Sequence, residues 1–143
     1  MAIHIERSIS INAAPERVWT VIADVERWPE WTESMKSVER LDGRELDVGS
    51  KAKLKIRRSP NANIWTVTEL TPNRSFTWET NSGGVKGVAT HLIEPDGNGS
   101  KVTLTVDLSG PVATLFGWFV GAPSRQNVEM EAEGLKRRAE GQA

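Results

Sequence analysis

The fold of this chain is decided by residues 13–31, which read AAPERVWTVIADVERWPEW. Pro15 suits the first turn of a helix, because its missing N–H needs no partner there. Apolar side chains then recur at the i, i+3, i+4, i+7 spacing of one helix face, at Val18, Val21, Ile22 and Val25. Pro29 ends the helical segment, because the residue before a proline is pushed out of the helical region. Two tryptophans, Trp28 and Trp31, lie on the tight connection that follows.

Two pieces of this stretch carry a family resemblance, APERVW at residues 14–19 and DVERWPEW at residues 24–31. They resemble the polyketide cyclase/dehydrase and lipid transport superfamily, also called START-like, SRPBCC or Bet v 1-like. The resemblance implies an α+β helix-grip fold. In that fold a curved seven-stranded antiparallel sheet wraps around a long C-terminal helix, with one or two short helices between strands 1 and 2.

The rest of the chain agrees with that order of elements. Alternating apolar residues predict seven strands, near residues 3–11, 35–41, 51–57, 65–70, 76–80, 85–93 and 102–108. Leu70 breaks the alternation of its strand, which indicates a bulge. A helical pattern runs from Pro111 to about Ala139, and Pro123 should kink or briefly break it. We therefore expect one START-like domain over residues 1–143.

The bulk properties describe an ordinary globular chain of 143 residues, 38% apolar and 26% charged. A formal net charge of −1 gives no electrostatic reason to expect nucleic acid. No cysteine is present, which excludes disulfides and thiol catalysis. The N-terminus lacks a signal-peptide pattern, and the longest apolar run, residues 112–122, is too short to span a bilayer. We expect a cytoplasmic protein without an integral membrane segment, either a monomer or a weak homodimer.

His91 is the candidate for chemistry. It shares a predicted inward face with Gly87 and Ala89, which leave room beside it. Its imidazole could hold a ligand oxygen or act as a general acid/base; the alternative is a core histidine satisfied by a neighbour. Because no acidic residue lies on the predicted inner faces, we expect His91 to be neutral. The glutamates at 129, 131 and 133 are interpreted as a solvated helix surface.

Arg7 interrupts the apolar face of the first strand. It is interpreted either as a strand end near solvent or as a charge that points into a cavity. Metal-binding patterns such as H-E-x-x-H are absent, so we expect no metal and no cofactor.

Six tryptophans without a single tyrosine, beside small residues such as Gly87, favour a lined cavity. Residues 24–31 and 112–122 should flank its mouth. The predicted ligand-binding residues come from inward strand positions, the Trp-Pro-x-Trp corner and the last helix; they are Trp31, Leu54, Ile56, Trp65, Phe76, Trp78, Ala89, His91, Leu115, Phe119 and Ala122.

The leading prediction for function is binding, and potentially transport, of a hydrophobic small molecule in an internal cavity. The resemblance implies lipids, polyketides, isoprenoids or quinones as the ligand classes. One alternative is a polyketide aromatase/cyclase-like enzyme with His91 as acid/base. A second is a protein-interaction module of the same fold, like the cochaperone and toxin branches of the superfamily.

Overall fold

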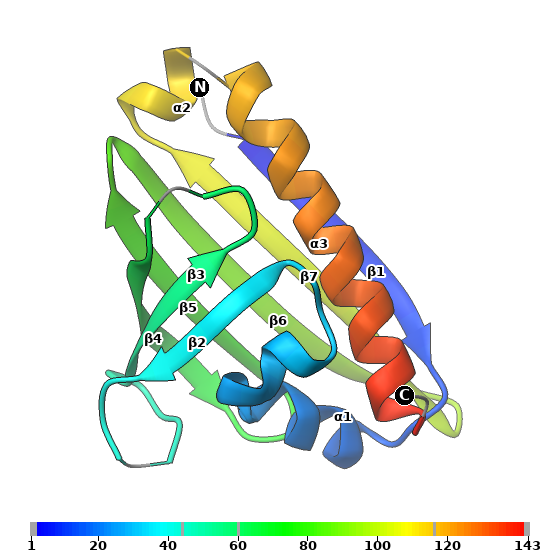
Figure 1. Cartoon of the computed structure of the whole chain (residues 1–143). Coiled ribbons are helices and arrows are strands. Elements are labelled where there is room, and N and C mark those ends of the chain that lie inside the picture. The colour runs from blue at the N-terminus through cyan, green and yellow to red at the C-terminus, as the bar shows by residue number, and fades with distance from the viewer. Residues whose placement is uncertain (1–2, 44, 60, 116, 142–143) are drawn as a thin grey trace.

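The computed structural model describes residues 3–43, 45–59, 61–115 and 117–141, apart from the side chains of residues 115–120. Figure 1 shows the whole chain. In chain order the elements are β1 (Ile3–Ile11), α1 (Pro15–Ala23), the 3₁₀ helix η1 (Val25–Glu30), β2 (Met35–Arg40), β3 (Lys51–Ile56), β4 (Asn63–Thr71), β5 (Ser75–Ser82), β6 (Val85–Asp96), β7 (Gly99–Ser109), α2 (Pro111–Leu115) and α3 (Gly117–Ala139).

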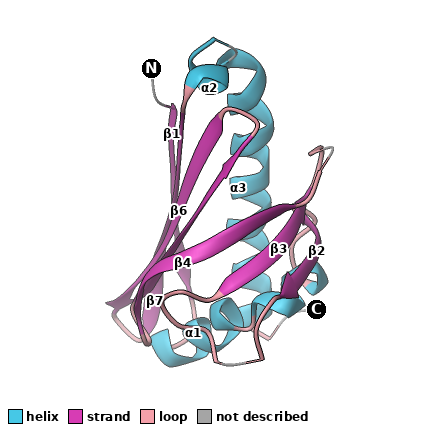
Figure 2. Cartoon of the chain, turned by 90° about the vertical axis from the view of Figure 1, so that its left-hand side faces the viewer, coloured by secondary structure: helices cyan, strands magenta, loops and turns pink. Residues whose placement is uncertain are grey.

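The seven described strands form one sheet in the order β1-β7-β6-β5-β4-β3-β2, and their pairings are antiparallel. The sheet curls, so that β2 and β3 run across the direction of β1 and β6 (Figure 2). Helix α3 lies against the concave side, next to β1 (Figure 1). This arrangement is the predicted helix-grip fold.

Alternation along the strands sends one set of side chains to the core between sheet and helices. In β4 the buried positions are Trp65 and Val67, and the register against β5 then shifts between Val67 and Glu69. This shift is the bulge that the parity break at Leu70 predicted. It lets Leu70 pack against the core although it follows Val67 by three residues.

Helix α1 and the 3₁₀ helix η1 close one end of the sheet. The first turn of α1 is fixed by the carbonyl of Ala14, which accepts hydrogen bonds from the amides of Arg17 and Val18. The apolar stripe of α1 faces the core, with Val18 and Ile22 at most 1% exposed. Trp28 of η1 is buried as well, and its indole Nε1 donates to the carbonyl of Ile22 at 3.0 Å. The two short helices predicted between strands 1 and 2 are therefore present.

The C-terminal helical region differs from the prediction at one point. Helix α3 is continuous through Pro123, from Gly117 to Ala139, so the predicted break at this proline is absent. A proline removes one backbone hydrogen bond. Contacts between α3 and β1 hold the helix against the sheet despite that loss.

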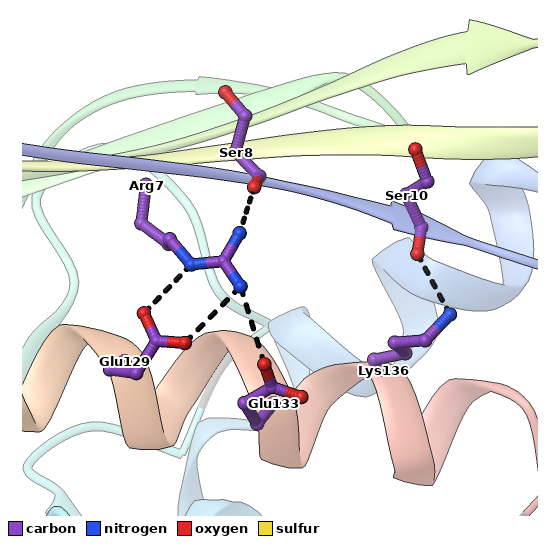
Figure 3. A network of polar contacts seen from close by, with 6 residues as sticks. All are labelled: Arg7, Ser8, Ser10, Glu129, Glu133 and Lys136. Atoms are coloured by element: carbon purple, nitrogen blue, oxygen red, sulfur yellow. Dashed lines mark hydrogen bonds and ion pairs between the residues drawn. The ribbon is translucent and has the colours of Figure 1, made fainter.

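Arg7 fastens β1 to α3 (Figure 3). Its guanidinium contacts Glu129 Oε2 at 2.7 Å and Glu133 Oε1 at 3.2 Å, on the solvent side of α3. One turn further on, Lys136 Nζ donates to the carbonyl of Ser10 at 2.9 Å. Arg7 is a half-buried surface residue, so its charge lies near solvent and does not point into the cavity. It lies in the middle of β1, however, and not at the strand end that was expected.

Candidate functional site

A cavity of about 120 Å³ lies between the concave side of the sheet, η1 and α3. Its sheet wall comes from inward positions of β3 to β7, among them Leu54, Ile56, Trp65, Trp78, Ala89, His91 and Leu104. Trp28 of η1 closes one side. The helix wall consists of Ser124, Asn127, Val128 and Glu131.

Small residues beside indoles make the space. Trp78 and Ala89 face each other as cross-strand partners on β5 and β6. A Cβ at Gly87 would lie 3.2 Å from Cη2 of Trp65, so only glycine leaves that indole its full room. The sequence therefore builds the cavity by placing its smallest inward residues next to its largest ones.

Aromatic rings cluster at the inner end of the cavity. The ring centroid of Trp28 lies 5.4 Å from that of Trp78 and 5.4 Å from that of His91. Phe76 lies behind this group, stacked on His91 at 4.2 Å with an interplanar angle of 13°. These contacts hold the rings in fixed orientations, which gives the cavity a rigid aromatic wall.

His91 is 3% exposed and is held at both ring nitrogens. Nδ1 lies 3.1 Å from the carbonyl oxygen of Phe76. A carbonyl oxygen can only accept, so Nδ1 carries a hydrogen and donates it. Nε2 faces Oε2 of Glu131 at 3.6 Å, which is ion-pair range but longer than a hydrogen bond.

Glu131 corrects two expectations. It was interpreted as part of a solvated helix surface, but its side chain is 14% exposed and lines the cavity. It also provides the acidic partner that was missing from the predicted inner faces, so the basis for expecting a neutral His91 is wrong. The physical reason is that the face of α3 that turns inward carries polar residues such as Glu131, which an apolar pattern does not identify.

The His91–Glu131 pair brings two titratable side chains from different elements, β6 and α3, to the cavity wall. Such a pair is a chemical prerequisite of general acid/base catalysis.

Two polar atoms of the wall are buried and have no hydrogen-bond partner among the described residues. They are the indole Nε1 of Trp65 and the amide Oδ1 of Asn127. The first is a donor and the second is an acceptor. Burial of unpaired polar atoms is unfavourable, so each needs a partner from within the cavity.

The structure brings six of the eleven predicted binding residues together around the cavity: Leu54, Ile56, Trp65, Trp78, Ala89 and His91. Phe76 and Trp31 are buried beside the aromatic cluster without lining the space. Ala122 is exposed on α3. Leu115 and Phe119 lie outside the residues whose side chains are described.

Sequence reasoning missed Trp28, Asn127 and Glu131 as parts of the wall. The signal for the helix wall was present, since residues 124, 127, 128 and 131 follow the i, i+3, i+4, i+7 spacing of one helix face. Three of those four residues are polar, and a search for apolar periodicity passes over them. Helix residues 124–131 form the helix side of the cavity among the described residues. Most of residues 112–122, which were predicted to flank the cavity mouth, have side chains outside the described residues.

Within the described ranges, no cluster of three or more histidine, aspartate and glutamate side chains could hold a metal ion. The helices in the described part of the chain are also too short or too polar to cross a membrane.

Comparison with known proteins agrees with this geometry. Residues 2–140 match the family described as polyketide cyclase/dehydrase and lipid transport. A relative in Mycobacterium tuberculosis, Toxin Rv0910, is 30% identical over 109 residues, which cover 73% of this chain and 74% of the relative.

Solved structures share the fold at low sequence identity. The Zhui aromatase/cyclase from Streptomyces sp. R1128 superposes with a TM-score of 0.80 at 19% identity, over 100% of both chains. A START superfamily protein from Mycobacterium smegmatis gives 0.75 at 18% identity, over 96% of this chain and 97% of the other.

The chain belongs to the polyketide cyclase/dehydrase and lipid transport family. Its fold is one that binds hydrophobic ligands, in a family that includes polyketide cyclases.

Proposed function

We propose that this protein binds a small hydrophobic ring compound in the cavity. The observation that carries the proposal is the wall itself: three indoles, from Trp28, Trp65 and Trp78, surround about 120 Å³ of space. Concave, mostly apolar sites with a few polar groups are typical of small-molecule binding. The family and fold support the same class of function.

The size of the cavity limits the ligand. Pockets for drug-sized ligands measure about 300–1,000 Å³, whereas this one has about 120 Å³. An engineered apolar cavity of about 150 Å³ holds benzene. The cavity therefore suits a single ring, such as the head of a quinone or one ring of a polyketide. A longer lipid or a fused polyketide needs α3 and the sheet to separate.

Toluene is a suitable probe, followed by NMR of the methyl groups of Leu54 and Leu104, which both line the cavity. The Ala89→Leu variant should abolish saturable binding, because its added carbons fill the space. Val88→Leu is the matched control, since it changes the neighbouring residue on the opposite face of β6. Equal binding to both variants would refute the proposed site.

A second candidate is an acid/base enzyme of the cyclase/dehydrase kind, and the His91–Glu131 contact at 3.6 Å favours it. In a dehydration, the pair removes a proton from the carbon beside a carbonyl and returns one to the departing hydroxyl, which leaves as water. The variants His91→Phe and Glu131→Gln should then abolish turnover of a poly-β-ketone thioester while its binding persists. Unchanged turnover in both variants would exclude this role.

A third candidate is a toxin-like role through interaction with another protein; the relative from Mycobacterium tuberculosis is named as a toxin. Under that alternative a protein surface matters and the cavity does not. Growth arrest on expression of the chain, persisting in the cavity-filling Ala89→Leu variant, would support it. Absence of any growth effect from the wild-type chain would count against it.

A further inference from the structure

We infer that the ligand of the cavity is a neutral hydroxylated ring compound that hydrogen-bonds to Trp65 and Asn127. The inference rests on the proposed function, since it takes the cavity to be a ligand site. It assigns those two residues as the specificity-determining contacts.

Trp65 supplies the donor. Trp65 lies on β4 and pairs with Ala52 of the neighbouring strand β3. Its side chain is 7% exposed. Its indole Nε1 is buried without a hydrogen-bond partner in the described part of the chain. By contrast, Nε1 of Trp28, on the same wall, is satisfied by the carbonyl of Ile22. An indole N–H can only donate, so Trp65 requires an acceptor from the cavity contents.

Asn127 supplies the acceptor. It lies on the inward face of α3, one helical turn before Glu131. Its amide Oδ1 is likewise buried and unpaired among the described residues. A carbonyl oxygen of this kind only accepts, so Asn127 requires a donor from the cavity contents. A hydroxyl group can both accept and donate, so a hydroxylated ligand offers the kind of partner that each of the two residues requires.

The charge and shape of the cavity wall narrow the class of ligand further. Among the lining residues that the structure describes, the titratable side chains are His91 and Glu131, and they face each other. None of the described lining residues is a lysine or an arginine that could bind an anionic ligand. The two unpaired atoms, on Trp65 and Asn127, belong to neutral groups. The three indoles favour a flat ring. Phenol represents this class at the size of the cavity.

Phenol and toluene provide a matched pair, because they differ by a hydroxyl in place of a methyl group. We expect phenol to bind at least as tightly as toluene although it is the more water-soluble of the two. Phenol should also move the indole N–H signal of Trp65 in the NMR spectrum, and toluene should leave it in place. The only variant of Trp65 that this second measurement needs is Trp65→Phe, which assigns the indole N–H signal.

The variant Asn127→Leu keeps the size of the side chain and removes its acceptor. Phenol affinity should fall at least tenfold in this variant, with toluene affinity unchanged. Gln126→Leu is the control, because that neighbouring side chain is exposed and lies outside the cavity.

Three results would overturn the inference, and they differ in what else they overturn. Tight toluene binding with phenol at least tenfold weaker refutes the hydroxyl contacts and leaves the proposed function intact. Retention of a buried water at the Trp65 indole N–H while phenol is bound also refutes them, because water is then the partner. Failure of both probes to bind refutes the proposed function and the inference together.

Discussion

Replacement of Gly134 by alanine tests how closely α3 is packed against the Trp-Pro-x-Trp corner. A Cβ at Gly134 would lie 1.9 Å from the carbonyl oxygen and 3.0 Å from the carbonyl carbon of Trp31. Both atoms belong to the backbone, so no rotamer change can relieve the clash. Ordinary van der Waals contact begins at 3.4 Å. Helix α3 and the Trp-Pro-x-Trp corner would therefore have to move apart until the new Cβ lies about that far from the Trp31 carbonyl.

The expected magnitude combines two opposing terms. Glycine to alanine in a helix interior favours folding by about 1 kcal/mol. Forced overpacking of a core costs about 1–3 kcal/mol, and the upper end applies because the movement disturbs buried neighbours such as Leu135 and Trp31. We expect Gly134→Ala to destabilise the protein by about 2 kcal/mol net, which lowers Tm by roughly 5–10 °C for a chain of this size.

Gly121 is the matched control on the same helix. A Cβ there would meet Nη1 of the Arg125 side chain at 3.0 Å, and that flexible group can move away. Gly121→Ala should therefore leave stability unchanged or raise it by up to about 1 kcal/mol. Urea denaturation followed by circular dichroism measures both variants. If Gly134→Ala were as stable as the wild type, the inferred close approach of α3 to Trp31 would be wrong.

Three further predictions concern polar contacts. The hydrogen bond that His4 donates to Asp107 raises the pKa of His4 above its ordinary value, so NMR titration should show this shift, and Asp107→Asn should reverse most of it. A raised pKa stabilises the fold at low pH, and this contribution is lost as the pH rises through that pKa. The hydrogen bond from Arg7 lowers the pKa of Glu129, so a double-mutant cycle with Arg7→Met and Glu129→Gln should give a coupling below about 1 kcal/mol at neutral pH. That coupling should be lost as the pH falls through this lowered pKa, and its persistence once Glu129 is protonated would contradict the assignment. Trp28→Phe removes the hydrogen bond to a buried carbonyl of α1 and opens space, so denaturation should show that the free energy of unfolding falls by about 2–4 kcal/mol. A decrease below about 1 kcal/mol would contradict the tight packing of Trp28.

Local sequence rules predicted the sheet and its inward face. Strand alternation identified Trp65, Trp78 and His91 as neighbours on one side, because successive residues of a strand point to opposite faces. The bulge followed from a single break of parity at Leu70. Each of these features depends on a few consecutive residues, which a sequence displays directly.

The helix side of the cavity could not be predicted in the same way. Which face of α3 turns inward depends on contacts far apart in the sequence, such as Arg7 with Glu129 and Gly134 with the Trp31 carbonyl. Those contacts orient α3 so that Glu131 faces His91. The two residues are therefore neighbours in the folded chain although they lie far apart in the sequence. The local helix rule also predicted a kink or a brief break at Pro123, whereas α3 is unbroken there.

The pairing of β1 with β7 has a consequence for synthesis of the chain on the ribosome. Ile3 pairs with Leu108 and Ile11 with Ser100, so the first strand to be made waits for the last. At about 5–20 residues per second, that delay is roughly 5–20 s. Strands β3 to β7 can each pair with the preceding strand as they emerge, whereas the isoleucines of β1 stay uncovered throughout. A nascent chain that stalls before residue 100 therefore carries an unpaired apolar strand at its N-terminal end, open to chaperones and to other unfinished chains.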